Sequence, residues 1–169
     1  MNESNGVNTD RSLKKESIAN ILEGLSVQQL VEVEHLLATY KNKPEEEQGG
    51  KVMMHLFGRF AGLKQLDAGK MEMGLGLQNV NTYGVAQGGS IYTLADVAIG
   101  FKILERLLQG QKVFTLEMKV NFINKGVGTR LIATPSILRW GKSTVVAECT
   151  IEDDGGEIVA KALGTFYVR

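Results

Sequence analysis

The chain has 169 residues, of which 43% are hydrophobic and 22% are charged, as expected for a globular protein with one main domain. Its 19 basic residues balance its 19 acidic residues, so no overall charge favours nucleic-acid binding. The single cysteine, Cys149, excludes an intramolecular disulfide and fits a reducing compartment. Neither a signal-peptide pattern nor an apolar run of roughly 18 residues is present, so we expect a cytoplasmic protein that contacts no membrane.

Metal and cofactor sites are not expected from the sequence. The two histidines, His35 and His55, have no second ligand type at metal-binding spacing. No glycine-rich stretch follows a predicted strand and opens a helix in the manner of a nucleotide-binding loop.

Residues 1–45 are predicted to form an N-terminal helical extension and linker, followed by one domain at residues 46–169. After a frayed segment up to about residue 9, the apolar spacing predicts a helix from Asp10 to Glu23. A second helix begins at Ser26, where Gln29 completes a capping box. Such an extension suits a docking arm, a dimerisation element or the remnant of a helix-turn-helix, and packing on its own domain or a symmetry mate is the reading we favour.

The main domain is predicted to begin with a short helix at residues 51–62, with Leu56, Phe57 and Phe60 facing inward. A hairpin follows, and then a glycine-rich loop leads into a long apolar helix from Ser90 to about Leu107. Four strands linked by short turns complete the chain, at residues 114–122, 129–138, 143–151 and 157–168. In the first of them, alternation places Phe114 on the apolar face and Thr115 on the polar face.

This order of elements predicts an α+β fold. Strands joined by tight turns are antiparallel, and one apolar helix beside about six such strands is buried only when the sheet curls around it.

The segment from Asn81 to Phe101 holds the most unusual residue of the chain. Asp96 is the only residue between Gln87 and Phe101 that is charged at neutral pH, in a helix that is otherwise mostly apolar. A carboxylate on such a helix is costly unless it is paired, protonated or used in chemistry. Asp96 is therefore the first candidate for a catalytic residue.

The spacing of Asn81, Gly84, Gln87, Gly88, Gly89 and Leu94–Ala95–Asp96 resembles the signature of the hotdog-fold acyl-CoA thioesterases of the phenylacetic-acid-degradation type, relatives of the 4-hydroxybenzoyl-CoA thioesterases. The resemblance covers roughly residues 51–169. It implies the hotdog fold, a homodimer or homotetramer with active sites at subunit interfaces, and hydrolysis of an acyl- or aryl-CoA thioester, with coenzyme A entering only as part of the substrate.

The resemblance also implies roles for individual residues. Asp96 would be the general base or the nucleophile, and the backbone N–H of Gly88 would bind the oxyanion. Asn81 would orient the carbonyl or the water, and Thr115 would reach the water across a dimer interface. Gln87 stands where the family usually has histidine; it preserves hydrogen bonding but cannot serve as an acid. The residues expected to contact the substrate or its CoA part are Gly89, Tyr92, Arg139 and Lys142.

Two other functions fit parts of the sequence. A non-catalytic hotdog sensor of acyl-CoA could carry a DNA- or partner-binding helical region, but Asp96 is present and the helix around Glu32 and Glu34 lacks the basic side chains that phosphate contacts need. A dehydratase-like or acyl-binding hotdog protein would be expected to place a histidine in the segment from Asn81 to Phe101, and none is there.

Overall fold

The computed structural model describes residues 3–41, 54–66 and 69–169. The chain divides into two compact units, Met1–Ala38 and Thr39–Arg169. We call the first the helical unit and the second the sheet domain, and describe each by itself. The predicted boundary between residues 45 and 46, with the linker around it, lies outside the described residues.

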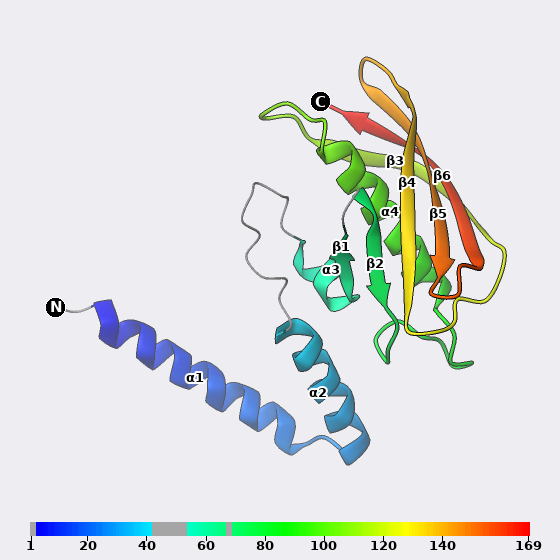
Figure 1. The fold of residues 1–169 in the computed structure, drawn as a ribbon. Coiled ribbons are helices and arrows are strands. Elements are labelled where there is room, and N and C mark those ends of the chain that lie inside the picture. Colours follow the sequence, from blue (N-terminus) through cyan, green and yellow to red (C-terminus); the bar gives the residue numbers. More distant parts are fainter. Residues whose placement is uncertain (1–2, 42–53, 67–68) are drawn as a thin grey trace. The chain divides into compact units, whose positions relative to one another are not determined.

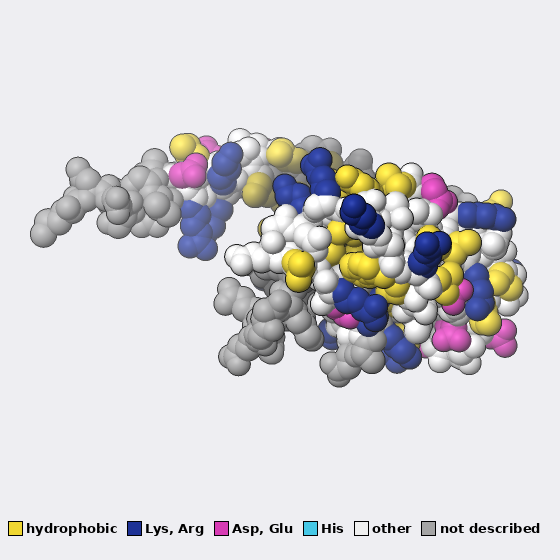
Figure 2. Space-filling view, turned by 90° about the horizontal axis from the view of Figure 1, so that it is seen from above, with side chains coloured by type: hydrophobic (Ala, Val, Ile, Leu, Met, Phe, Trp, Pro, Cys, Tyr) yellow, Lys and Arg dark blue, Asp and Glu magenta, His cyan; other side chains and the backbone are white. Residues whose placement is uncertain are grey.

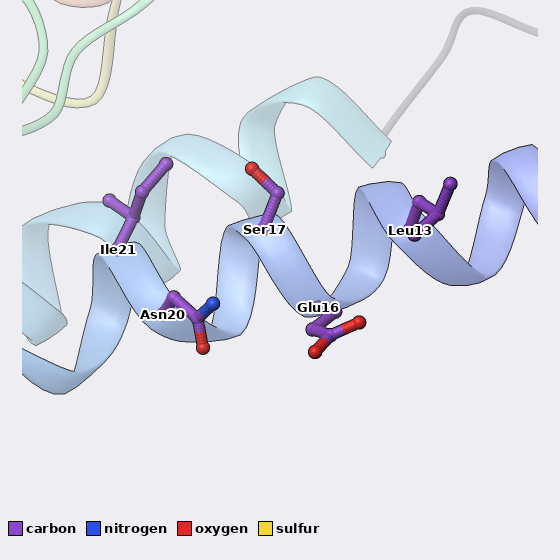
Figure 3. Close-up of a pocket in the computed structure, with 5 residues that line it drawn as sticks. All are labelled: Leu13, Glu16, Ser17, Asn20 and Ile21. Atoms are coloured by element: carbon purple, nitrogen blue, oxygen red, sulfur yellow. The ribbon is translucent and has the colours of Figure 1, made fainter.

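The helical unit contains α1 (Glu3–Glu23) and most of α2 (Val27–Lys41). The capping box is confirmed, since the backbone N–H of Ser26 donates to Gln29 Oε1 over 2.9 Å. The frayed segment predicted up to residue 9 is wrong from Glu3 onward. The polar side chains on which that prediction rested do not by themselves prevent a helix. Figure 3 shows a shallow pocket on α1, where Leu13, Ser17 and Ile21 share one side of the helix.

The sheet domain begins with a short helix and a hairpin. They are α3 (Leu56–Phe60), β1 (Leu63–Gln65) and β2 (Met71–Gly74). The prediction that the apolar side chains of α3 face inward is wrong, because Leu56, Phe57 and Phe60 are exposed. Within α3 only Gly58 is buried, and a helix of five residues has too few turns to cover a sheet.

The predicted α+β hotdog architecture is confirmed in the rest of the domain. One long helix, α4 (Gly88–Leu104), lies along the inner face of a six-stranded antiparallel sheet in the order β1-β2-β4-β5-β6-β3 (Figure 1). The four C-terminal strands are β3 (Val113–Phe122), β4 (Arg130–Trp140), β5 (Thr144–Asp153) and β6 (Ile158–Val168). The core is formed where α4 meets the sheet, for example at Leu94, Ile99, Ala147 and Phe166.

A β-bulge changes the faces of β3. The register with β6 shifts between Thr115 and Glu117, so the regular alternation expected from the sequence is interrupted at Leu116. Thr115 therefore lies on the inner face, where it contacts α4, and not on the outer polar face as predicted. Phe114 and Leu116, expected on the apolar side, are exposed.

Candidate active site

Three contacts join one side of α4 to the edge strand β3. Asp96 Oδ1 accepts a 2.7 Å hydrogen bond from Thr115 Oγ1. One turn earlier, the hydroxyl of Tyr92 donates to the backbone carbonyl of Met118 over 2.8 Å. At the start of the helix, a Cβ placed on Gly88 would lie 3.4 Å from Phe122 Cζ. Residues four apart share a helix face, so Gly88, Tyr92 and Asp96 form one row along β3.

The Asp96–Thr115 pair supplies the only carboxylate in this row. Asp96 is half-buried and Thr115 is exposed, so the carboxylate can be reached from solvent. The hydroxyl fixes one carboxylate oxygen and leaves the other free to accept a proton or to attack a carbonyl. The expected burial of Asp96 is thus only partial. Thr115, expected to reach the water across a dimer interface, contacts Asp96 within one chain.

The N-terminus of α4 presents free hydrogen-bond donors. Gln87 is the N-cap residue: its carbonyl accepts from the N–H groups of Ser90 and Ile91, and its side-chain Oε1 also accepts from Ser90. The N–H groups of Gly88 and Gly89 donate to no acceptor among the described residues. They lie at the positive end of the helix dipole, which suits a developing oxyanion.

The side chain of Gln87 occupies the space that a side chain at position 89 would need. A Cβ on Gly89 would lie 2.8 Å from Gln87 Oε1, closer than Cβ contacts in proteins. The absence of a Cβ at Gly89 therefore leaves room for the capping side chain. The glutamine in place of the family's histidine is engaged in a hydrogen bond that orders the helix start.

An open groove lies beside Gly88, with a volume of about 530 Å³. Its lining comes from the loop before α4, from α4 itself and from the end of β3 with the following loop: Val85, Ala86, Gly88, Ile91, Phe122, Ile123, Asn124, Lys125 and Gly126. The groove combines apolar walls, a free N–H at its edge and one cation. The sequence reasoning missed Lys125 because it is separated by 37 positions from Gly88 and sits in a turn that predicts only solvent exposure.

Asn81 lies in the turn before the helix. Its Oδ1 accepts hydrogen bonds from the N–H groups of Tyr83 at 2.9 Å and Val85 at 3.3 Å. The side-chain amide nitrogen has no hydrogen-bond partner among the described residues, so it can donate to a substrate or a water. The turn thus orients Asn81 and leaves its donor available.

Arg139 and Lys142 lie away from this groove. They belong to the β4–β5 hairpin, whereas Gly88 is near the opposite end of the sheet, next to Gly126 and the start of β4. Arg139 lies nine positions after Arg130 along β4, which corresponds to roughly 30 Å. Figure 2 shows Lys and Arg side chains spread around an apolar area. Within one chain Arg139 and Lys142 do not line the groove beside Gly88, whereas their hairpin lies at the end of the sheet where Thr115 is found.

Other chemistry is not indicated by the described residues. No group of three or more His, Cys, Asp or Glu side chains among them could hold a metal ion. Burial raises the pKa of Cys149 to about 12, so its thiol is inert near neutral pH. No helix within the described ranges is long and apolar enough to cross a membrane.

Comparisons with known proteins agree with this architecture. The family model described as Thioesterase superfamily matches residues 83–160. A Saccharolobus solfataricus protein with an esterase name is 29% identical over 85 residues, which cover 50% of this chain and 60% of that protein. The chain thus spans less than two thirds of the length of the curated relatives it matches.

Solved structures show the same fold. A Bacillus halodurans protein crystallised with CoA has a TM-score of 0.75 at 23% identity, over 91% of this chain and 99% of that one. The E. coli PaaI protein of the phenylacetic acid degradation operon has a TM-score of 0.59 at 22% identity, over 78% and 88% of the two chains. These matches confirm the hotdog fold, and together with the family-model match they confirm the resemblance to thioesterases.

Proposed function

Since residues 83–160 match the thioesterase superfamily and the sheet domain has the hotdog fold of thioesterases, we propose that this chain hydrolyses acyl- or aryl-CoA thioesters to an acid and free CoA. The observation that carries the proposal is the row along α4. It places a hydroxyl-bound carboxylate, Asp96, and free N–H donors at Gly88 on one helix face that is open to substrate.

The reaction requires two functions, a base or nucleophile and an oxyanion site. Asp96 either takes a proton from water as the water attacks the thioester carbonyl, or attacks the carbonyl itself to form an anhydride that water then cleaves. In both cases the carbonyl oxygen gains negative charge, which the N–H of Gly88 stabilises. The CoA thiolate leaves and is protonated by solvent.

The two functions are far apart within one chain. Eight residues separate Gly88 from Asp96, which is about 12 Å along the helix axis. The bond to Thr115 also holds the carboxylate near the Val113 end of β3, whereas the groove lies at the Phe122 end. One carbonyl is therefore poorly placed to contact both groups of the same chain.

A second copy of the chain would resolve this separation. Strand β3 is a ten-residue edge strand whose outer edge has no partner among the described residues. Antiparallel pairing of two such edges would turn the Thr115 end of one strand toward the Phe122 end of the other. The Asp96–Thr115 pair of each subunit would then face the Gly88 groove of its partner.

The activity is tested by assaying a panel of acyl-CoAs and aryl-CoAs for release of free thiol, with Asp96→Asn as the control. We expect turnover of at least one substrate class by the wild type and a loss of at least about 100-fold in kcat for the variant. Equal turnover by wild type and variant would refute the role of Asp96.

The shared site is tested by mixing two inactive variants. Asp96→Asn removes the carboxylate, and Gly88→Pro removes the oxyanion donor. In a randomly mixed dimer with shared sites, one site of each heterodimer has both groups intact, so about a quarter of wild-type activity should return. No recovery, with subunit exchange verified by mass spectrometry, would place both groups in the same chain.

A further inference from the structure

The loop that precedes Gly88 is anchored by a buried polar residue, Asn79. Its side chain is only 2% exposed and makes three hydrogen bonds. Nδ2 donates to the carbonyl of Gly74 over 2.7 Å and to that of Ala61 over 3.1 Å, and Oδ1 accepts from the N–H of Gly76 over 3.0 Å. These bonds join the end of β2, the turn after α3 and the start of the loop at one amide group.

The backbone of Asn79 also binds Gln87, the residue directly before the free N–H donors. The carbonyl of Asn79 accepts from the N–H of Gln87 over 2.9 Å. Gln87 caps α4 and is followed directly by Gly88. The position of the Gly88 N–H is therefore connected to the sheet through two residues, Gln87 and Asn79.

We propose that Asn79 is a positioning residue for the oxyanion site, one that acts through Gln87 to fix the direction of the Gly88 N–H. The proposal rests on the thioesterase function proposed above. Between Asn79 and Gln87 the chain makes a small hairpin, with a bridge between Val80 and Ala86 and an exposed tip at Tyr83. The hairpin itself has few buried side chains, so its base must be fixed from outside.

Among the described residues, one other backbone hydrogen bond connects the base of the hairpin to a different segment of the chain. In it, the N–H of Ala86 donates to the carbonyl of Gly126. The Gln87–Gly88 peptide is held on its helix side, where the Gln87 carbonyl accepts from the N–H groups of Ser90 and Ile91, and the bond to Asn79 fixes the N–H side of Gln87, on which the position of that peptide also depends. Loss of the Asn79 side chain would also leave the N–H of Gly76 without its partner in a partly buried site, which favours local rearrangement of the loop. A displacement of about 1 Å in a catalytic donor can lower the rate about 100-fold.

The test compares Asn79→Ala with Val145→Ala, a core control in which a side chain of β5 with no exposed surface is shortened at the opposite end of the sheet. The two variants are assayed at temperatures equally far below their own melting points. For Asn79→Ala we expect kcat to fall between about 10-fold and 100-fold with KM changed less than about threefold, and for Val145→Ala no comparable fall. Equal losses in both variants would overturn the proposal.

A third variant, Asn79→Asp, keeps the size of the side chain and replaces the donor with an acceptor that faces two carbonyl oxygens. A protonated carboxyl restores one donor, so the ratio of its kcat to that of the wild type should rise as the pH falls. A ratio independent of pH would contradict the assigned hydrogen bonds.

Hydrogen exchange separates this proposal from the proposed function. In Asn79→Ala, amide exchange of the segment 80–89 should accelerate by at least about tenfold, while exchange in β5 stays unchanged. If the wild type proves inactive on all thioesters, the function fails while the exchange data still decide whether Asn79 holds the loop. Unchanged exchange in the segment would overturn the positioning role whatever the activity.

Discussion

Replacement of Gly88 by proline tests the oxyanion donor more directly than any side-chain substitution, because the donor is a backbone N–H. Proline removes that hydrogen and is well tolerated as the first residue of a helix. Gly88 is the first residue of α4, and the preceding Gln87 is extended at ψ 136°, as a residue before proline prefers. The substitution therefore deletes one donor with little expected cost to the helix.

The expected magnitude follows from the single donor that is lost. Removal of one oxyanion donor lowers kcat by about 100- to 1,000-fold, equivalent to about 2.7–4 kcal/mol. Thiol release under saturating acyl-CoA measures this change, and thermal unfolding checks that the fold is intact.

The matched control is Gly88→Ala, which keeps the N–H. The new Cβ would meet Phe122 Cζ at 3.4 Å, an ordinary van der Waals contact, so the alanine variant should retain most of its kcat. If alanine and proline reduce kcat equally, space at this position matters and the donor does not. If neither reduces it, the oxyanion assignment is wrong.

Three further predictions concern other residues of the sheet domain. Thr115→Val removes the hydroxyl that binds Asp96 and should lower kcat about tenfold. Thr115→Ser retains the hydroxyl and should keep kcat. Steady-state kinetics measures both variants, and equal losses of kcat would contradict the role of the hydroxyl. Because burial raises the pKa of Cys149 to about 12, the thiol of the folded protein should not react with a disulfide reagent at pH 8. On unfolding, one thiol per chain should react and release one equivalent of the reagent's thiol. Rapid reaction of the native protein would contradict the burial of Cys149. If the groove holds the phosphates of CoA, Lys125→Ala should raise KM several-fold with kcat preserved while Lys142→Ala has no effect; the reverse result would support the sequence-based assignment of Lys142.

The fold was largely predictable because its signals are local. The long apolar stretch after Gln87, the alternation within the C-terminal strands and the short turns between them each depend on neighbouring residues. Together they leave few ways to bury the helix other than inside a curled sheet. The length of α1 was less predictable, because weak helix formers near its start do not by themselves end a helix.

The position of Thr115 was not predictable from alternation. A bulge adds one residue to β3 without any glycine to mark it, and the apolar residues on both sides of Thr115 continue the regular pattern in sequence. Only the pairing with β6, far along the chain, reveals the shift in register. The resemblance to a family singled out the residue, whereas strand periodicity assigned it to the wrong face.

The anchoring of the loop was missed for a different reason. Asn79 reads as an ordinary turn residue, and its partners include Ala61, which is 18 residues away in sequence. The amide of Asn79 is buried because α3, β2 and the loop pack together around it. Such a tertiary contact leaves no pattern in the neighbouring residues of the sequence.

The two adjacent glycines at the start of α4 are subject to different evolutionary constraints. Gly88 has space for a small side chain, so selection there would act on the backbone donor and on access for the substrate. Gly89 is limited by the side chain of Gln87, so a larger residue at that position should appear together with a shorter cap such as serine or threonine. Among related sequences, a larger residue at the second glycine should therefore occur only together with a shorter cap residue.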